Sequence, residues 1–202
     1  MPPEDKEALK LIAARAALDF VVPGSVLGVG SGSTVNRFIS LLAPIAPQLP
    51  GAVAASESSA AALRAAGISV LNLNAVDTIP VYVDGADEID PQFAMIKGGG
   101  AALTREKIIG SAAGTFVCIV DQSKLVDRLG AFPLPLEVIP MAVQSVCRRI
   151  VGMGGAPLVR PNVISDNGNA IIDVTGLSFD NPVELESELN QWPGIVCNGV
   201  FA

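Results

Sequence analysis

The sequence predicts an α/β fold in which residues 1–130 form a Rossmann-like, doubly wound and mainly parallel sheet, and residues 131–202 form a smaller ferredoxin-like α+β domain. Two observations support this prediction. Before Gly130, short apolar runs alternate with stretches of helical periodicity, as in parallel sheets that are covered by helices. After the proline-rich stretch 132–140, the expected elements follow the order βαββαβ, which is the ferredoxin-like split unit.

In the first domain, strands and helices are expected to alternate from the N-terminus onward. The predicted elements are a helix over 4–22, a strand over 25–29, a helix over 35–42, a strand over 52–55, a helix over 57–66, strands over 68–71 and 80–84, a helix over 101–109 and a strand over 115–120. Ligands of such a sheet gather at the carboxyl ends of its strands. Polar residues that directly follow these strands are therefore the first candidates for a site.

In the second domain, an Asn167-Gly168 turn is expected to join two strands as a hairpin, and Asn181 is expected to cap a helix that begins with proline. The predicted elements are strands over 134–139, 157–165, 170–174 and 195–201, with helices over 141–151 and 182–191. This domain contains no cluster of candidate catalytic groups. We therefore expect a structural role for it, or a role in subunit contact.

The composition limits the classes of protein to consider. Half of the 202 residues are apolar, which suits a soluble globular protein of one large or two modest domains. No apolar run reaches the length of a membrane span, and the first residues lack the pattern of a secretory signal, so we expect a cytoplasmic protein with no membrane partner. The net charge of -7 argues against nucleic acid as a partner.

The counts of cysteine and histidine limit the chemistry. The three cysteines are odd in number, widely spaced and set among apolar residues, so we interpret them as buried small hydrophobic residues rather than a disulfide framework or a zinc site. The sequence contains no histidine, which removes the most common acid/base near neutral pH and the most common metal ligand. Proton transfer must then depend on carboxylates, lysine or tyrosine.

The stretch 97–107 is the most informative part of the chain. It brings Lys97, the three glycines Gly98–Gly100 and Glu106 to a point where a loop is expected to become a helix. Glycines let the backbone expose its amide donors, so such a turn can hold an anion, and the glutamate beside it can move a proton. A plain glycine turn ahead of an amphipathic helix with a solvated charged face remains an alternative.

A second loop follows the predicted strand 25–29. It does not fit a dinucleotide fingerprint, because Ser33 or Val35 fills the place of the third glycine, and it does not fit a P-loop. The hydroxyl groups of Ser31, Ser33 and Thr34, together with free amides that open a helix, suit one phosphate group. The alternative is a serine-rich helix cap.

Four carboxylates lie in the stretch 84–90, directly after an apolar strand. A calcium loop is excluded because Ile89 fills the place of its glycine and Met95 the place of its bidentate glutamate. Asp84 and Asp87 could face one cleft and either bind sugar hydroxyls or handle protons, while magnesium at the same pair stays open. Lys124, after the strand 115–120, and Lys10 are each either a site residue or a surface lysine.

With these motifs in order, the chain resembles the type A family of ribose-5-phosphate isomerases. The matching segments are Gly-Val-Gly-Ser-Gly-Ser-Thr at 28–34, Tyr-Val-Asp-Gly-Ala-Asp-Glu-Ile at 82–89, Met-Ile-Lys-Gly-Gly-Gly-Ala-Ala-Leu-Thr-Arg-Glu-Lys at 95–107, Asp-Gln-Ser-Lys at 121–124 and the proline-rich stretch at 132–142. The resemblance implies interconversion of ribose 5-phosphate and ribulose 5-phosphate in the non-oxidative pentose phosphate pathway. It also implies that the enzyme needs no metal and no organic cofactor, and that it forms a homodimer or homotetramer.

The resemblance assigns a role to each matching position. Glu106 is the implied base that moves a proton between carbons 2 and 1 through an enediolate, and Lys97 is the group that stabilises its charge. Asp84 and Asp87 are the implied pair that binds hydroxyls and assists ring opening. The implied substrate-binding residues are Ser31, Gly32, Ser33, Thr34, Asp84, Gly85, Ala86, Asp87, Lys97, Gly98, Gly99, Gly100 and Lys124.

Two alternatives remain from the residues alone. An amino-sugar-phosphate isomerase/deaminase would need a ring-opening histidine, which this chain lacks. A sugar-phosphate sensor would keep the phosphate loop but have no use for the pair of Glu106 and Lys97. The family's chain normally continues past Phe201 with a polar turn and a final strand, so we expect that tail to be missing from this sequence.

Overall fold

The parallel sheet of the predicted fold is present in a computed structural model that describes residues 3–202. The chain divides into two units. The first contains the residues up to Gly85 together with Arg105–Ser123, and the second contains Ala86–Thr104 together with Lys124–Ala202. This division differs from the contiguous boundary expected at residue 130, because residues 86–104 group with the C-terminal part of the chain.

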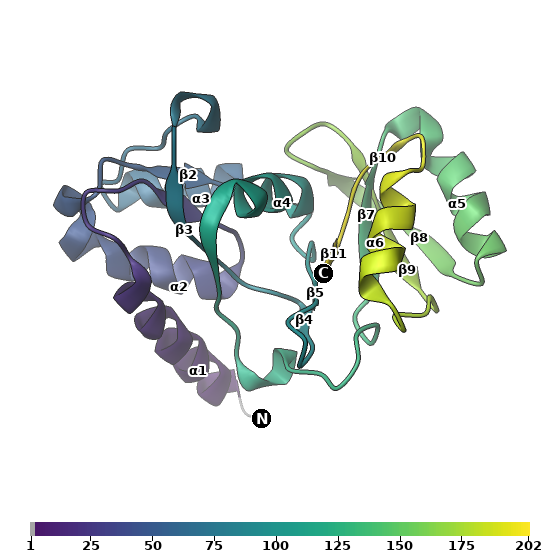
Figure 1. The fold of residues 1–202 in the computed structure, drawn as a ribbon, viewed down its shortest axis with the longest axis horizontal. Coiled ribbons are helices and arrows are strands. Elements are labelled where there is room, and N and C mark those ends of the chain that lie inside the picture. The colour runs from purple at the N-terminus through teal and green to yellow at the C-terminus, as the bar shows by residue number, and fades with distance from the viewer. Residues whose placement is uncertain (1–2) are drawn as a thin grey trace. The chain divides into compact units, whose positions relative to one another are not determined.

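The first unit is built on a four-stranded parallel sheet with the strand order β2-β1-β3-β6. Figure 1 labels β2 and β3 of this sheet. Its strands are β1 (Leu27–Val29), β2 (Ala52–Ala54), β3 (Ile79–Asp84) and β6 (Ala113–Cys118). From β1 the chain proceeds to one side, to β2, and then returns to the other side, to β3. The carboxyl ends of β1 and β3 therefore form the topological switch point, where doubly wound sheets bind their ligands.

Helices cover both faces of this sheet. They are α1 (Pro3–Ala16), α2 (Ser33–Leu42), α3 (Glu57–Ala65) and α4 (Leu103–Ala112), with short 3-10 helices at Ala17–Phe20, Ala43–Gln48, Leu73–Ala75 and Gln122–Lys124. On one face, Val29 and Val83 of the strands pack with Phe38 of α2. On the other face, Tyr82 packs with Ile109 of α4. Alternate strand residues thus enter different cores, as a sheet buried on both sides requires.

Three elements predicted for the first domain differ from the structure. The helix expected over 4–22 ends as an α-helix at Ala16 and continues as a 3-10 helix to Phe20. The strand expected over 68–71 is reduced to a single bridge between Ala52 and Val70. The helix expected from residue 101 begins at Leu103, because Ala101 has a φ of 62° and closes a turn back to Gly98. A left-handed residue cannot continue a right-handed helix.

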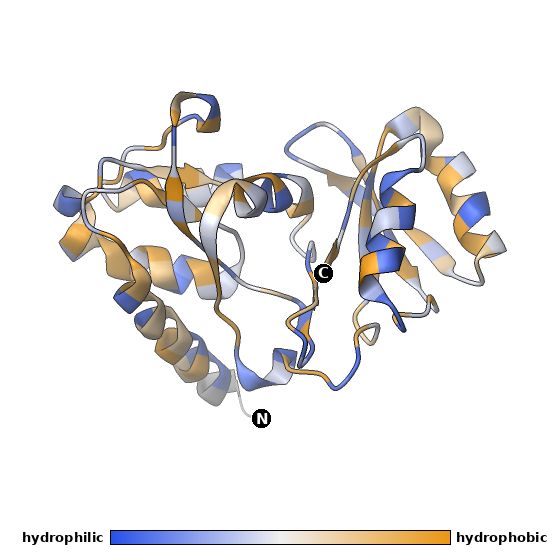
Figure 2. Cartoon of the chain, viewed as in Figure 1, coloured by the Kyte–Doolittle hydropathy of each residue, from blue (hydrophilic) through white to orange (hydrophobic). Residues whose placement is uncertain are grey.

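The second unit contains a four-stranded antiparallel sheet in the order β10-β7-β9-β8, with β7 (Leu134–Val138), β8 (Ala156–Ile164), β9 (Ala170–Thr175) and β10 (Ile195–Asn198). The helices α5 (Val143–Gly152) and α6 (Pro182–Asn190) complete the βαββαβ order that the sequence predicts. Asn181 accepts a hydrogen bond from the Glu184 amide and so caps α6, as expected. In Figure 2, α6 carries both hydrophobic and hydrophilic positions, and its Leu189 enters the core with Leu134.

A small three-stranded sheet also belongs to the second unit. It pairs β4 (Glu88–Ile89), β5 (Met95–Ile96) and β11 (Val200–Phe201). The single strand expected over 195–201 is therefore split at Gly199, since β10 pairs with β7 and β11 pairs with β5. The two-residue strands β4 and β5 are too short to carry a periodic pattern, so the sequence did not predict them.

The three cysteines and the apolar character of the helices are the last features of the fold. Cys118, Cys147 and Cys197 form no disulfide with one another, and only Cys197 is buried, so the prediction that all three are buried is wrong for the two half-buried thiols. Among the helices of residues 3–202, none combines the length and the apolar character that a bilayer span requires.

Candidate active site

Three predicted residues meet at the switch point of the first unit. The Ser31 hydroxyl, in the loop after β1, donates to Glu106 Oε1 at 2.6 Å, and the Ser31 amide donates to Asp84 Oδ1 at 3.0 Å. Asp84, which ends β3, is fully buried, and Glu106 of α4 is 4% exposed. Two carboxylates that are 22 residues apart in sequence thus share one serine residue as a hydrogen-bonding partner.

Gly30 allows this close approach. A Cβ atom at Gly30 would lie 1.9 Å from the carboxyl carbon of Asp84, so no other residue fits there without displacing the Asp84 side chain. The Gly30 amide donates to Val83 O, and the Gly30 carbonyl accepts from the Ser59 hydroxyl at 2.7 Å. The loop is therefore fixed from both the sheet and α3.

Tyr82 supplies another donor to Asp84. Its hydroxyl donates to Asp84 Oδ2 at 2.5 Å, while the Gly85 amide donates to Oδ1 at 2.7 Å. Burial raises the pKa of the Tyr82 hydroxyl well above its ordinary value, and the negative charges of Asp84 and Glu106 raise it further. Tyr82 therefore remains a neutral donor that holds the carboxylate in place.

Helix α2 begins inside the predicted phosphate loop. Gly32 has a φ of 101°, which an L side chain rarely adopts, and its carbonyl accepts the first helical hydrogen bond, from Asn36. Ser33 opens the helix and, like Gly32, is exposed, whereas Ser31 and Thr34 are half-buried. The unpaired amides of a helix N-terminus attract anions, so the predicted residues lie where a phosphate group can bind.

The second unit contains Lys97 and Gly98–Gly100, on the turn between β5 and α4. Lys97 is 2% exposed, its amide donates to Gly199 O, and its ammonium lies 5.4 Å from the centroid of the Phe201 ring. Gly98 has a φ of 107°, which explains the need for glycine at that position. The Gly99 amide donates to Asp87 Oδ2 at 2.7 Å, so Asp87 anchors the turn.

Arg160 and Asp173 hold the same turn, and the sequence did not single them out. Arg160, on β8, donates to Gly99 O at 2.9 Å and to Gly98 O at 3.2 Å. It also forms a bidentate ion pair with Asp173 of β9, at 2.6 and 2.7 Å. Both side chains are mostly buried.

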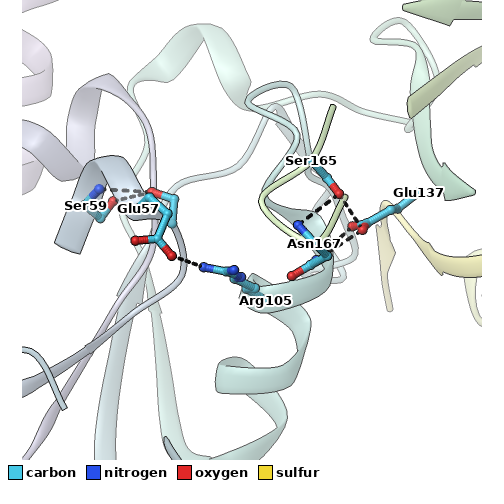
Figure 3. Close-up of polar contacts among 7 residues, drawn as sticks. Glu57, Ser59, Arg105, Glu137, Ser165 and Asn167 are labelled. Carbon is cyan, nitrogen blue, oxygen red and sulfur yellow. Dashed lines mark hydrogen bonds and ion pairs between the residues drawn. The ribbon is translucent and has the colours of Figure 1, made fainter. Parts of the chain in front are cut away.

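The buried carboxylate of Glu137, on β7, was also missed (Figure 3). It accepts hydrogen bonds from Thr104 in the first turn of α4, from Ser165 at 2.7 Å, from Asn169 at 2.8 Å and from Asn167 at 3.1 Å. Burial raises the pKa of Glu137, but the four donors outweigh it and hold the pKa below its ordinary value. The hairpin after β8 is thereby tied to the start of α4.

The remaining predicted residues lie as follows. Gly85 and Ala86 are half-buried and join the two units along the chain, and Lys124 is half-buried at the end of a 3-10 helix. Lys10 pairs with Glu7 on α1 at 2.8 Å. Asp84 and Asp87 have separate hydrogen-bond partners, one set in each unit. Within residues 3–202, no group of three or more His, Cys, Asp or Glu side chains is arranged to hold a metal ion.

A separate pocket of about 560 Å³ opens beside α3 in the first unit. Arg105 lines it and forms an ion pair with Glu57 at 2.9 Å, which Figure 3 draws. The hydrogen bond and charge of Arg105 lower the pKa of the exposed Glu57 carboxylate. Neither residue belongs to the predicted site.

Of the residues that the sequence analysis missed, Tyr82 carried a usable signal. It stands two residues before Asp84 on the same strand, so the two side chains lie on the same face. Arg160, Asp173 and Glu137 carried none, because each meets the glycine turn or α4 only through the pairing of the antiparallel sheet.

Comparison with known proteins gives a consistent result. The family model described as ribose 5-phosphate isomerase A (phosphoriboisomerase A) matches residues 51–202. The chain is 57% identical over 198 residues to the ribose-5-phosphate isomerase A of Leptothrix cholodnii, an alignment that covers 98% of this chain and 90% of that protein.

Solved structures are similar as well. The crystal structure of ribose 5-phosphate isomerase A from Neisseria gonorrhoeae matches with a TM-score of 0.95 and 45% identity, and the match covers 98% of this chain and 88% of that one. A D-ribose-5-phosphate isomerase in complex with phospho-erythronic acid matches with a TM-score of 0.92 and 42% identity, covering 97% of this chain and 90% of that one.

Proposed function

Because the chain belongs to the ribose 5-phosphate isomerase A family, we propose the roles of its own residues in the interconversion of D-ribose 5-phosphate and D-ribulose 5-phosphate. An aldose-ketose isomerase must move one proton between neighbouring carbons and stabilise the anion formed on the way. It must also hold the phosphate. The family match over nearly the whole chain is the observation that carries this proposal.

Glu106 is the proposed base. It takes a proton from carbon 2 of the open-chain aldose, which leaves an enediolate. It then returns the proton to carbon 1 while the hydroxyl proton of oxygen 2 passes to oxygen 1, which gives the ketose. The reverse steps return the aldose. Its burial and the hydrogen bond from Ser31 support this role, since they fix one carboxylate oxygen in a partly water-excluded position.

Lys97 is the proposed electrophile, whose ammonium stabilises the negative charge of the enediolate. Its near-complete burial supports the role, because a charge acts more strongly where water is excluded. The amides of Gly98–Gly100 are proposed substrate contacts. The left-handed conformation of Gly98 and the anchoring of Gly99 by Asp87 support a fixed turn.

Asp84 and Asp87 are proposed to bind sugar hydroxyls and to assist ring opening by proton transfer. Ser31, Gly32, Ser33 and Thr34 are proposed to hold the substrate through the start of α2. Gly85, Ala86 and Lys124 are proposed as further substrate contacts. No cofactor and no metal ion enters this mechanism.

We also infer that the enzyme works in the non-oxidative pentose phosphate pathway, in the cytoplasm and as a homodimer or homotetramer. Exposed apolar side chains of the second unit, including Met141, Leu158 and Ile164, support self-association. Sedimentation of the purified chain tests the oligomer, and a single monomeric species would contradict it.

The experiment for the catalytic roles compares wild type with Glu106→Gln, which keeps the shape of the side chain and removes the base. Turnover of ribose 5-phosphate and exchange of solvent deuterium into the sugar are both expected to fall by roughly 10²- to 10⁴-fold, the usual share of general acid-base catalysis. Phospho-erythronic acid is expected to compete with substrate in both proteins.

Glu57→Gln is the matched control. It removes a carboxylate from an exposed position in the same unit, so it is expected to keep wild-type turnover. If Glu106→Gln also keeps it, the assignment of the base is wrong. If the wild-type chain binds ribose 5-phosphate without converting it, the protein is a sensor rather than an isomerase.

A further inference from the structure

Four of the five N–H donors of the Arg160 guanidinium are engaged within the second unit. Nε and Nη2 donate to the two oxygens of Asp173, at 2.6 and 2.7 Å, and Nη1 and Nη2 donate to the carbonyls of Gly99 and Gly98. The side chain of Arg160 is 15% exposed. Four of its donors are thus directed at the protein, and the charge is balanced by Asp173, so Arg160 is poorly suited to bind a phosphate itself.

The carbonyls that Arg160 holds determine where the amides point. In a planar trans peptide, the N–H group points opposite to the preceding C=O. Because Gly98 O accepts a hydrogen bond from Arg160, the Gly99 amide points away from Arg160, and there it donates to Asp87. With Gly99 O on Arg160, the Gly100 amide must also point away from Arg160.

The turn needs such external support. Consecutive glycines have the largest backbone freedom of any sequence, and ordering them has a correspondingly large entropic cost. Gly99 and Gly100 are exposed, so few packing contacts restrain them. A planar fork that bonds two adjacent carbonyls restrains both peptide planes at once, which an ammonium group does not do.

We propose that Arg160, held by Asp173, is a positioning residue that orients two amides of the glycine turn, the Gly99 amide onto Asp87 and the Gly100 amide toward the substrate. The inference rests on the proposed function, in which this turn contacts the sugar phosphate. It gives the antiparallel sheet of the second unit a share in catalysis, since β8 and β9 carry the two residues.

The test measures kcat, KM and the binding of phospho-erythronic acid in Arg160→Ala, Arg160→Lys and Asp173→Asn. Loss of hydrogen bonds from a charged donor is expected to lower kcat/KM by about 10- to 100-fold in Arg160→Ala and to weaken binding of the analogue in the same direction. Arg160→Lys is expected to have a kcat/KM only slightly above that of Arg160→Ala. Asp173→Asn is expected to lower kcat/KM less than Arg160→Ala does.

Chemical rescue separates positioning from a purely structural role. Ethylguanidinium at millimolar concentration is expected to restore part of the activity of Arg160→Ala, while ethylammonium, with the same charge, is expected not to. Arg128→Ala is the matched control, because Arg128 forms an exposed ion pair with Asp180 in the same unit. Its kinetic constants are expected to match wild type.

The proposal is overturned if Arg160→Ala and Arg160→Lys keep the kinetic constants of Arg128→Ala. It is also overturned if activity falls only in proportion to the folded fraction, seen by thermal unfolding, and no guanidinium compound restores it. Should Arg160→Ala fail to fold, Arg160→Lys and Asp173→Asn decide by the same criteria. Failure of the proposed function is distinct, because it is seen in wild type and Glu106→Gln.

Discussion

The hydroxyl of Ser31 lies 2.6 Å from Glu106 Oε1, and the amide of the same serine lies 3.0 Å from Asp84 Oδ1. One residue of the loop after β1 thus positions the proposed base and a second carboxylate. Because Asp84 ends β3 and Glu106 belongs to α4, the arrangement depends on three separate elements. Each of these three elements can be perturbed separately by a substitution.

Replacing Ser31 with alanine removes the hydroxyl that positions Glu106 and leaves the backbone amide in place. A hydrogen bond to a charged group contributes about 1.5–3 kcal/mol, so kcat is expected to fall by roughly 10- to 100-fold. Steady-state turnover of ribose 5-phosphate measures this fall in kcat. Ser40→Ala, on the exposed side of α2, is the control and should match wild type. Equal turnover in all three proteins would refute the positioning of Glu106 by Ser31.

Gly30→Ala places a methyl group where the Asp84 carboxylate now lies. Overpacking of this kind usually costs 1–3 kcal/mol, so the free energy of unfolding is expected to fall by about that amount, together with activity. Gly152→Ala in α5 is the matched control, because nothing lies within 4 Å of the added atom. Alanine favours a helix over glycine by about 0.8–1.0 kcal/mol at interior positions, so that variant is expected to be at least as stable as wild type in urea unfolding.

Tyr82 is the only tyrosine in the sequence, so its titration can be followed by absorbance without interference. Its pKa is raised by burial first and by Asp84 and Glu106 next. The native protein is therefore expected to show no tyrosinate at pH about 10, where an unfolded tyrosine is half ionised. Tyrosinate should appear at that pH when urea unfolds the chain. Ionisation of the native protein near pH 10 would contradict the buried donor.

The same shift has a consequence for stability. The folded state binds the Tyr82 proton more tightly than the unfolded state does. The contribution of Tyr82 to the free energy of unfolding is therefore complete below the pKa of the unfolded tyrosine and is lost as the pH rises above that pKa. In Tyr82→Phe, the free energy of unfolding is expected not to show this loss at alkaline pH.

Glu137→Gln tests the network that ties the hairpin after β8 to α4. The pKa of Glu137 is lowered in the folded state, so its stabilising contribution is complete above the unfolded pKa and is lost as the pH falls through the folded one. Wild type is therefore expected to lose more stability than Glu137→Gln on acidification below pH about 4.3, the ordinary value for glutamate. Urea unfolding at several pH values measures the difference, and parallel curves would count against the network.

The elements around Gly30 could be predicted from the sequence. Strand, loop and helix around Gly30 have strong local signals, and the switch point of a doubly wound sheet then brings the ends of β1 and β3 together. The structure adds the reason for glycine at Gly30, which is the approach of Asp84 rather than any torsion angle. Such a contact between distant parts of the chain has no signature in the local pattern.

Arg160 could not be predicted, because a bulge changes the register of its strand. The pair Ile164 and Ala170 flanks the Asn167-Gly168 turn, and counting outward from it would place Pro161 opposite Asp173. The pairing shifts within β8, and Leu158 lies there instead. The positive φ of Asn162 marks the irregular stretch. Four residues of β8, 160–163, thus lie opposite one residue of β9. Alternation of apolar residues alone does not reveal three extra residues of this kind.

Gly199 has a consequence for biosynthesis. Its carbonyl accepts the Lys97 amide, its own amide donates to Pro135, and a Cβ atom there would lie 2.3 Å from Lys97 O. During synthesis, the surroundings of Lys97 therefore stay incomplete until Gly199 has been added to the chain and has left the ribosome. Chains that stop before Gly199 should be catalytically silent.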